Sequence, residues 1–574
     1  MTLRIALLVV LTNVAGCQFS VAEAMPLATQ PPGNGQPATV NFKPHEFKAL
    51  DGTIVPAELG EFQVPENRTK PDSRKITIRF VRFKSTAAKP GAPIVYLAGG
   101  PGGSGIGSAM GSRLPLFLAL RELGDVIAYD QRGTNESGPK MTCDGEQYMG
   151  DPSKPLSRAT IAAMTDAVRR CAERLRREGV DINGYNTIEN AADLDDLRKA
   201  LGVPKLTLWG ISYGTHLAAA TLRYHPGAVE RVIMAGIEGP DDTYKLPSDQ
   251  ETLMEEIARL APNPDLLGSI NRLLAELEAR PKSVSLTHPL NGQTATFVFG
   301  KVDLQKVLAD MLFAPDSFAG MPDLVHRLER GDWLALGLLA GQARFGTAPS
   351  IMSVAMDCAS GISAGRRQRI AEEAARTHLG DAINMPFPEV CGAVNVADAG
   401  DEFRSALKSN VPVLLISGTL DGRTRPRQAE ELRMTMPNAE HLVLVGAGHS
   451  DPLFLSSPKI LEAMKAFLRG ERLRERYIEL PKPGFLPLHD VATVSDAVLE
   501  RYVGTYRVDA KTTRKVVKAG SVLYTIREGG QPLAIRPLSE TEFFFEGRGG
   551  GVRFEPGAMV VRQADGSEAR ALRE

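Results

Sequence analysis

A serine flanked by glycines lies within residues 210–214, whose sequence GISYG fits the pattern G-x-S-x-G. The motif follows an apolar run at 206–209, typical of a buried strand, and precedes a helical pattern at 216–222. A tight strand-to-helix turn projects the hydroxyl from the sheet edge, and the helix N-terminus places positive partial charge beside it. This context predicts that Ser212 is a nucleophile. The alternative is a Gly-Ser turn in which Ser212 only caps the helix.

A glycine-rich loop, GGPGGSG at residues 99–105, follows another apolar run at 93–98. A phosphate-binding loop would end in Lys and Ser or Thr, which this loop lacks, and a flexible turn is a further alternative. Its position ahead of the serine motif fits a loop that stabilises an oxyanion. We therefore expect the backbone amides of Gly100 and Tyr213 to hold the oxyanion, and each such donor typically contributes about 2.7–4 kcal/mol.

A serine hydroxyl near neutral pH needs a general base, and the chain has nine histidines. His449 lies in a glycine-rich loop after the apolar run 442–445, and Asp421 follows the run 411–416. The order Ser, Asp, His, each after a different strand, is the order of the α/β-hydrolase fold. We predict that His449 is the base and that Asp421 orients it. The alternatives are an ordinary loop histidine and a turn aspartate, and His216 lacks a suitably placed acid downstream.

The elements that must position these residues are short apolar runs separated by helical patterns. Such alternation predicts a mostly parallel sheet with helices on both faces, formed by residues 41–239 and 406–487. Residues 240–405 show mainly helical patterns and interrupt the sheet, which predicts a cap over its C-terminal edge. Residues 488–574 contain short strand-like runs with Gly-rich turns, and we expect a small antiparallel β domain.

The composition is that of a soluble globular protein. The chain has 574 residues, of which 43% are hydrophobic, and 67 basic residues nearly balance 68 acidic ones. This length predicts two or three structural units. A net charge of −1 gives no electrostatic reason to expect a nucleic-acid partner.

The N-terminus resembles an export signal. Residues 1–24 hold one positive charge followed by a short apolar stretch, which is typical of a signal peptide. Processing before Cys17 would make a lipoprotein, whereas the sequence AEA at 22–24 suits ordinary signal peptidase; the alternative is a buried N-terminal helix. Residues 25–40 read as a mobile leader. We expect a periplasmic, secreted or lipid-anchored protein of a bacterial envelope, and no later run reaches the roughly 18 apolar residues of a membrane span.

An exported protein enters an oxidising compartment, so the four remaining cysteines can be read as two disulfides. Their order suggests two local bridges, Cys143–Cys171 and Cys358–Cys391, although sequence alone allows three pairings, and four free thiols are the alternative. No cysteine or histidine spacing suggests a metal site.

These motifs together resemble the proline iminopeptidase and tripeptidyl aminopeptidase family of α/β hydrolases. The resemblance covers roughly residues 75–470 and rests on five motifs, namely GGPGGSG at 99–105, DQRGT at 130–134, GISYG at 210–214, SGTLD at 417–421 and GAGH at 446–449. It implies cleavage of residues or short peptides from free N-termini through an acyl-enzyme, with neither metal nor organic cofactor. It does not define oligomeric state.

Substrate recognition is where the chain departs from the family pattern. The family often has a histidine before the oxyanion glycines, and this chain has Ala98. The family's aminopeptidases bind the substrate ammonium with acidic side chains near the cap, so Glu238 and Asp241 are candidates, with a solvated acidic loop as the alternative. Asp130 and Arg132 are expected to be structural. An esterase or amidase with the same triad, and a catalytically silent binding protein, are the alternative functions.

Overall fold

A computed structural model describes residues 39–508 and 512–574. The predicted signal peptide, Cys17 and nearly all of the predicted leader lie outside the described residues.

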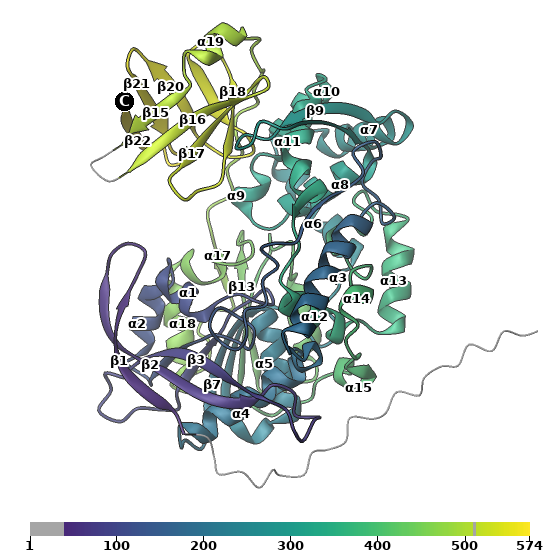
Figure 1. Cartoon of the computed structure of the whole chain (residues 1–574). Coiled ribbons are helices and arrows are strands. Elements are labelled where there is room, and N and C mark those ends of the chain that lie inside the picture. The colour runs from purple at the N-terminus through teal and green to yellow at the C-terminus, as the bar shows by residue number, and fades with distance from the viewer. Residues whose placement is uncertain (1–38, 509–511) are drawn as a thin grey trace, which may run out of the picture. The chain divides into compact units, whose positions relative to one another are not determined.

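A ten-stranded sheet forms the centre of the fold (Figure 1). Its strands lie in the order β1-β2-β3-β5-β4-β7-β8-β12-β13-β14. The strands β1 to β3 are antiparallel to their neighbours, and the other seven run parallel to one another. The bounds are β1 (Asn41–Lys48), β2 (Ile54–Pro65), β3 (Lys75–Phe83), β4 (Ile94–Leu97), β5 (Val126–Tyr129), β7 (Leu206–Ser212), β8 (Val229–Ile237), β12 (Val413–Gly418), β13 (Ala439–Val445) and β14 (Tyr477–Glu479). The predicted mostly parallel sheet is confirmed.

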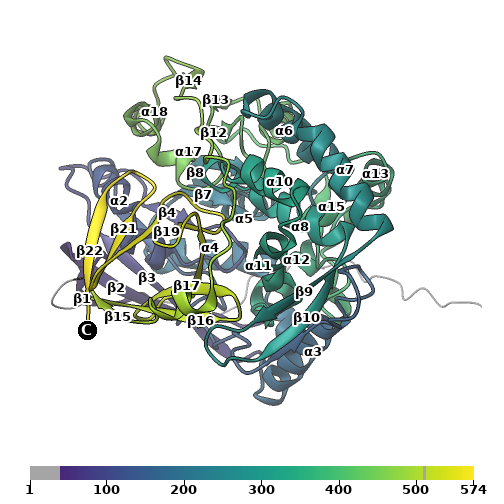
Figure 2. The ribbon, with the colours of Figure 1, turned by 90° about the horizontal axis from the view of Figure 1, so that it is seen from above.

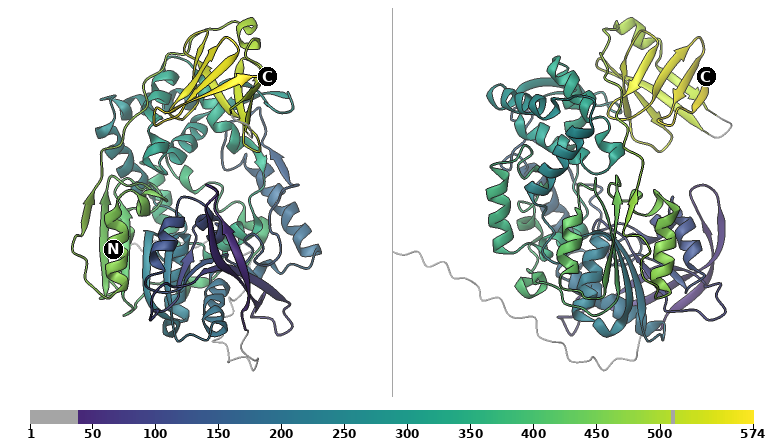
Figure 3. Two further views of the ribbon diagram at one scale, coloured as in Figure 1. Left: turned by 90° about the vertical axis from the view of Figure 1, so that its left-hand side faces the viewer. Right: turned by 180° about the vertical axis from the view of Figure 1, so that it is seen from behind.

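Helices cover both faces of this sheet (Figure 3). Alternate residues of β4 enter opposite cores: Val95 packs with α4 (Thr187–Ala200) and α5 (Tyr213–Tyr224). Tyr96 packs on the other face with α2 (Leu114–Leu120) and α18 (Pro458–Leu468). Because both faces are buried, the central strands read as continuous apolar runs rather than as alternating ones.

The insertion between β8 and β12 is mainly helical. Its longer helices are α6 (Pro247–Leu260), α7 (Leu266–Ala279), α8 (Lys301–Met311), α10 (Met321–Glu329), α11 (Trp333–Arg344), α12 (Ile351–Ser360) and α13 (Ala364–Ala374). It also contains a hairpin of β9 (Lys282–Thr287) and β10 (Thr294–Phe299), which lies beside α11 in Figure 2. Phe297 and Phe299 alternate inward from β10 and bury against the helices, so the hairpin belongs to the cap core.

An earlier segment of the chain also joins the cap. Strand β6 (Gln147–Met149) pairs with β11 (Phe345–Thr347), which follows α11. Helix α3 (Ala162–Arg177) contacts α14 (Cys391–Val394), which lies within the inserted region. The cap therefore draws on two separate parts of the chain.

The four cysteines form the two bridges that the sequence suggested. Cys143 is bonded to Cys171 in α3, and Cys358 in α12 is bonded to Cys391 at the start of α14. The bridged cysteines are 28 positions apart in the first pair and 33 positions apart in the second, and both bridges join segments of the cap. The second bridge fixes the C-terminal part of α12, which also contributes to the site described below.

The C-terminal region is a closed antiparallel barrel of eight strands, which confirms and sharpens the predicted β domain. The strands are β15 (Gly504–Arg507), β16 (Thr513–Ala519), β17 (Val522–Arg527), β18 (Leu533–Pro537), β19 (Glu542–Phe545), β20 (Gly551–Glu555), β21 (Ala558–Arg562) and β22 (Glu568–Arg573). A buried ion pair joins it to the cap, in which Arg327 Nη2 lies 2.6 Å from Glu546 Oε1. Across residues 39–508 and 512–574, every helix is too short or too polar to cross a bilayer.

Candidate active site

Ser212 lies in a sharp strand-to-helix turn between two closely packed glycines. It ends β7, and α5 begins at the next residue. Its backbone has φ 54° and ψ −127°, a region that L residues rarely adopt. A Cβ on Gly214 would lie 2.0 Å from the Leu97 carbonyl oxygen, and one on Gly210 would lie 2.6 Å from the Gly214 oxygen. Both glycines are therefore required for the turn that presents the serine hydroxyl.

The predicted oxyanion loop passes directly beside this serine. A Cβ on Gly99 would lie 2.9 Å from Ser212 Cβ, so the loop backbone touches Ser212. Gly100 has φ +125°, which favours glycine, and the Gly103 amide closes the loop by donating to the Gly99 carbonyl at 2.9 Å. Tyr213 is buried, and its amide belongs to the first residue of α5.

Asp421 and His449 form a buried hydrogen-bonded pair. His449 Nδ1 lies 2.8 Å from Asp421 Oδ2, and Thr424 Oγ1 donates to the same oxygen at 2.8 Å. The amides of Arg423 and Thr424 donate to Asp421 Oδ1. Burial opposes ionisation of Asp421, but the nearby His449 and these hydrogen bonds outweigh it, so the pKa of Asp421 is lowered. The aspartate is thus held as a carboxylate facing the imidazole.

A cap segment, residues 312–315, joins α8 to α9 (Pro315–Phe318) and packs against the loops that carry Asp421 and His449. The Phe313 carbonyl accepts a hydrogen bond from the His449 amide at 3.1 Å. The Phe313 ring meets the imidazole edge to face, with 5.1 Å between the ring centroids. A Cβ on Gly448 would lie 2.3 Å from Pro315 Cδ, so the approach is as close as glycine allows. The cap therefore contributes to the position of His449.

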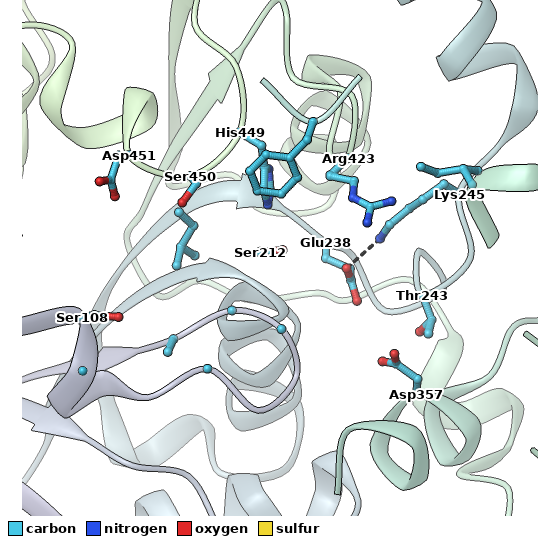
Figure 4. A pocket seen from close by; sticks show the side chains of 18 of the residues that line it. Ser108, Ser212, Glu238, Thr243, Lys245, Asp357, Arg423, His449, Ser450 and Asp451 are labelled. Atoms are coloured by element: carbon cyan, nitrogen blue, oxygen red, sulfur yellow. Dashed lines mark hydrogen bonds and ion pairs between the residues drawn. The ribbon is translucent and has the colours of Figure 1, made fainter. Parts of the chain in front are cut away.

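Ser212 and His449 open into one cavity of about 640 Å³ (Figure 4). The sheet side supplies its floor, and the cap supplies the opposite wall. The cap-side lining includes Glu238, Thr243, Tyr244, Lys245, Phe313, Asp357, Ile383, Asn384, Met385 and Phe387. Gly99 and Gly100 also line the cavity, so Ser212, His449 and the glycine loop face a common space.

Comparison with known proteins identifies the family of this chain. A family model described as the alpha/beta hydrolase fold matches residues 92–454. The chain belongs to this family. That span includes Ser212, Asp421 and His449, and it includes the cap.

Curated relatives of this α/β hydrolase match over shorter regions. Serine protease Hip1 of Mycobacterium tuberculosis is 32% identical over 32% of this chain and 36% of its own length. Tripeptidyl aminopeptidase of Streptomyces coelicolor is 30% identical over 35% of this chain and 39% of its own. A probable proline iminopeptidase of the same organism is 28% identical over 18% of this chain and 36% of its own. The chain thus spans little more than a third of the length of each relative. The solved structure of Rv0554 from Mycobacterium tuberculosis has 16% identity and a TM-score of 0.31, over 72% of this chain and 100% of that chain.

Three charged groups of this α/β hydrolase cluster on the cap side of the cavity. Glu238 follows β8 and forms an ion pair with Lys245, with 2.6 Å between Oε2 and Nζ. Asp357 projects from α12, and its carboxylate has no hydrogen-bond partner within residues 39–508 and 512–574. Burial, together with the negative charge of Glu238, raises the pKa of Asp357 well above its ordinary value. This carboxyl is open to a ligand.

The structure separates the two acidic residues that the sequence suggested for substrate binding. Glu238 lines the cavity, whereas Asp241 lies outside its lining. The Asp241 carboxylate instead accepts from the amide and hydroxyl of Ser363 at the start of α13. The chain turns between them, where the Gly239 amide donates to Asp242 Oδ2, so the two side chains point to different neighbours. Sequence reasoning missed Asp357, Lys245 and Arg423, because none belongs to a motif.

The remaining polar residues near the motifs have structural partners. His216 is buried between the Gly239 carbonyl and the Ser360 hydroxyl, and burial lowers its pKa. Asp130 accepts hydrogen bonds from Ser104 and from the Ile106 amide, which holds the glycine loop. Arg132 is fully buried and pairs with Asp193 at 2.6 Å. These contacts account for His216, Asp130 and Arg132 as structural residues.

Proposed function

We propose that the protein is a serine aminopeptidase that releases residues or short peptides from free N-termini. The observation that carries this proposal is the presence of two carboxylates, Glu238 and Asp357, on the cap wall of the cavity that holds Ser212 and His449. A cationic group is the ligand that such a wall favours, and a peptide N-terminus is an ammonium ion at neutral pH. The relatives named tripeptidyl aminopeptidase and probable proline iminopeptidase support the same reading.

Catalysis would proceed by two acyl transfers. His449 takes the proton of Ser212, and the hydroxyl oxygen attacks the scissile carbonyl. The amides of Gly100 and Tyr213 stabilise the oxyanion, and Asp421 stabilises the imidazolium. His449 then gives the proton to the leaving amine. Water, activated by the same imidazole, hydrolyses the acyl-enzyme and restores the serine.

Asp357 is the carboxylate best suited to hold the ammonium. Lys245 already pairs with Glu238, so the charge of Glu238 is largely balanced. Burial and the negative charge of Glu238 disfavour the ionised form of Asp357, and they outweigh the opposing effect of the Lys245 charge on its pKa. A substrate ammonium would relieve this cost by supplying a positive charge and hydrogen-bond donors. Blocking the N-terminus would remove that interaction.

The experiment compares free and N-acetylated forms of the same peptidyl anilides, together with simple esters. The wild-type protein is expected to hydrolyse the free forms with the higher kcat/KM. Asp357→Asn should remove most of that preference, and Asp241→Asn, matched in chemistry but outside the cavity, should retain it. Equal rates on free and blocked peptides would contradict the N-terminus proposal. Efficient hydrolysis of esters alone would favour the alternative, an esterase or amidase with the same triad.

We further propose that the protein acts outside the cytoplasm. The two disulfides support this, because such bridges persist in oxidising compartments. Mass spectrometry of the mature N-terminus would distinguish a lipid-modified Cys17 from cleavage after Ala24. An intact Met1 on the mature protein would contradict export through a cleaved signal.

A further inference from the structure

Arg423 occupies a defined position beside the catalytic groups. It lies two residues after Asp421, and its backbone amide donates to Asp421 Oδ1 at 2.7 Å. Its side chain lines the cavity, and Figure 4 shows the guanidinium pointing inward from the His449 side, near the Glu238–Lys245 pair. The base of this side chain is therefore anchored to the triad, and its charged end faces the substrate space.

This arginine differs from the next two arginines along the chain. Arg425 pairs with Glu256 at 3.0 Å, and Arg427 pairs with Asp249 at 2.8 Å. Within the described chain, the Arg423 guanidinium has neither an ion-pair partner nor a hydrogen-bond acceptor. Glu238, another acid that lines the cavity, accepts a hydrogen bond from Lys245 instead. Because a guanidinium stays protonated, Arg423 adds an unbalanced positive charge to the cavity.

Asp357 contributes an acidic group from a different element. It projects from α12 on the cap side, while Arg423 comes from the loop after β12. The cavity therefore presents one unpaired carboxyl group and one unpaired guanidinium, in addition to the ion pairs of Glu238 with Lys245 and of Arg113 with Asp451. A ligand that neutralises both unpaired groups carries an ammonium and a carboxylate on the same molecule.

We propose that Arg423 binds the side-chain carboxylate of an Asp or Glu residue within the segment that the enzyme releases. This inference rests on the proposed aminopeptidase function, in which Asp357 takes the N-terminal ammonium. A guanidinium and a carboxylate form two parallel charge-assisted hydrogen bonds, which give both affinity and geometric selectivity. The preferred substrates are then peptides with a free N-terminus and an acidic residue close to it.

The same geometry admits a less specific role for Arg423, in which it donates to substrate backbone carbonyls. Such contacts would raise the affinity for every peptide equally. They would not separate Glu from Gln, because the two side chains have nearly the same shape and differ in charge. A comparison of these two residues therefore distinguishes the two roles.

The test uses peptidyl 4-nitroanilides of one to three residues with a free N-terminus, in which Glu or Gln replaces alanine at each position in turn. The ratio of kcat/KM for Glu to that for Gln is measured within each protein variant, so changes in absolute rate cancel. For the wild-type protein we expect a ratio of about tenfold or more at one position, as charge-assisted hydrogen bonds commonly provide. In Arg423→Gln this ratio should fall to about one.

Two further variants make the result specific. Arg423→Lys keeps the charge but loses the paired geometry, and we expect an intermediate ratio. Arg433→Gln removes an exposed arginine of α16 (Pro426–Arg433), and the ratio should equal that of the wild type. This control excludes a general effect of net charge.

A Glu-to-Gln ratio near one at all positions in the wild type, or an unchanged ratio in Arg423→Gln, would overturn the inference. If free peptides are hydrolysed without this discrimination, only the role of Arg423 fails. If free peptides are not hydrolysed while simple esters are, the proposed aminopeptidase function itself fails.

Discussion

Asp421 Oδ2 lies 2.8 Å from Nδ1 of His449, and both side chains are buried. The chain brings the two residues together from loops after β12 and β13, neighbouring parallel strands of the sheet. A carboxylate in this position selects the imidazole tautomer whose other nitrogen accepts a proton. The relationship therefore links sheet topology directly to base catalysis.

Replacing Asp421 with Asn should lower kcat by about 10³–10⁴-fold, because the amide would favour the wrong imidazole tautomer. The measurement is steady-state kinetics on a free peptidyl anilide, with circular dichroism to check folding. A folded Asp421→Asn protein that retains wild-type kcat would contradict the assignment of Asp421.

Phe313 gives a second prediction, because a cap residue touches the catalytic base. Phe313→Ala removes the 5.1 Å ring contact with His449, and small displacements of a catalytic group reduce rates strongly. We expect the rate of inactivation by phenylmethanesulfonyl fluoride to fall about tenfold. This small reagent reports Ser212 reactivity with little dependence on the rest of the cavity. Phe313→Tyr keeps the ring and should react at nearly the wild-type rate; equal inactivation of the alanine variant would exclude a positioning role.

Asp357 predicts a pH dependence of substrate binding. Burial and the charge of Glu238 raise its pKa well above 3.8. As pH rises from that ordinary value through the raised pKa, the carboxyl ionises, so KM for free peptides should fall. KM should rise again where the substrate amine loses its proton, near pH 8. Asp357→Asn should abolish the fall in KM, and an unchanged profile would argue against contact with the ammonium.

The same pKa shift has the opposite consequence for folding. A carboxyl with a raised pKa binds its proton more tightly in the folded state than in the unfolded state. In the protein without substrate, its contribution to the free energy of unfolding is full below about pH 4 and declines as pH rises through the raised pKa. The thermal midpoint of Asp357→Asn should therefore rise relative to that of the wild type as pH increases.

The buried pair of Arg132 and Asp193 gives a stability prediction. Both side chains are fully buried, and Arg132 also donates to the carbonyls of Glu66 and Gly184. Arg132→Met should cost about 3 kcal/mol, at the low end for a broken buried pair, because Arg68 keeps its bond to Asp193. The measurement is the thermal midpoint. Arg169→Gln breaks an exposed pair with Asp166 and should cost no more than about 0.5 kcal/mol; similar shifts for both variants would contradict the burial argument.

The sequence predicted the parts of the fold that depend on local pattern. The central parallel strands appear as apolar runs because both of their faces are buried, and β7 with Ser212 and α5 shows the strand–serine–helix order directly. The hairpin of β9 and β10 was missed, although its connection contains an Asn-Gly pair at 291–292 that indicates a turn. Closure of the C-terminal barrel was also not predicted, because pairing of β15 with β22 is a long-range contact.

The proposed triad could be predicted from the sequence because its residues stand in motifs after strands, whereas the cap side of the cavity could not. Asp357 is the lone charged residue of α12, whose sequence IMSVAMDCAS is mostly apolar, but it belongs to no catalytic motif. Its exposure to the cavity depends on how α12 packs against the rest of the cap. Asp241 shows the reverse case, since its place in an acidic cluster suggested a site, yet its carboxylate binds the amide and hydroxyl of Ser363, the residue that caps α13.

The central claim is that Ser212 forms an acyl-enzyme with substrates that have a free N-terminus. The most direct measurement is peptide mass spectrometry of the protein acid-quenched during turnover of a free peptidyl ester. We predict that the peptide containing Ser212 gains the mass of the acyl segment, and that Ser212→Ala shows neither the adduct nor turnover above about 10⁻⁴ of the wild-type rate. Turnover that persists in Ser212→Ala, or an acyl adduct on another residue, would contradict the account.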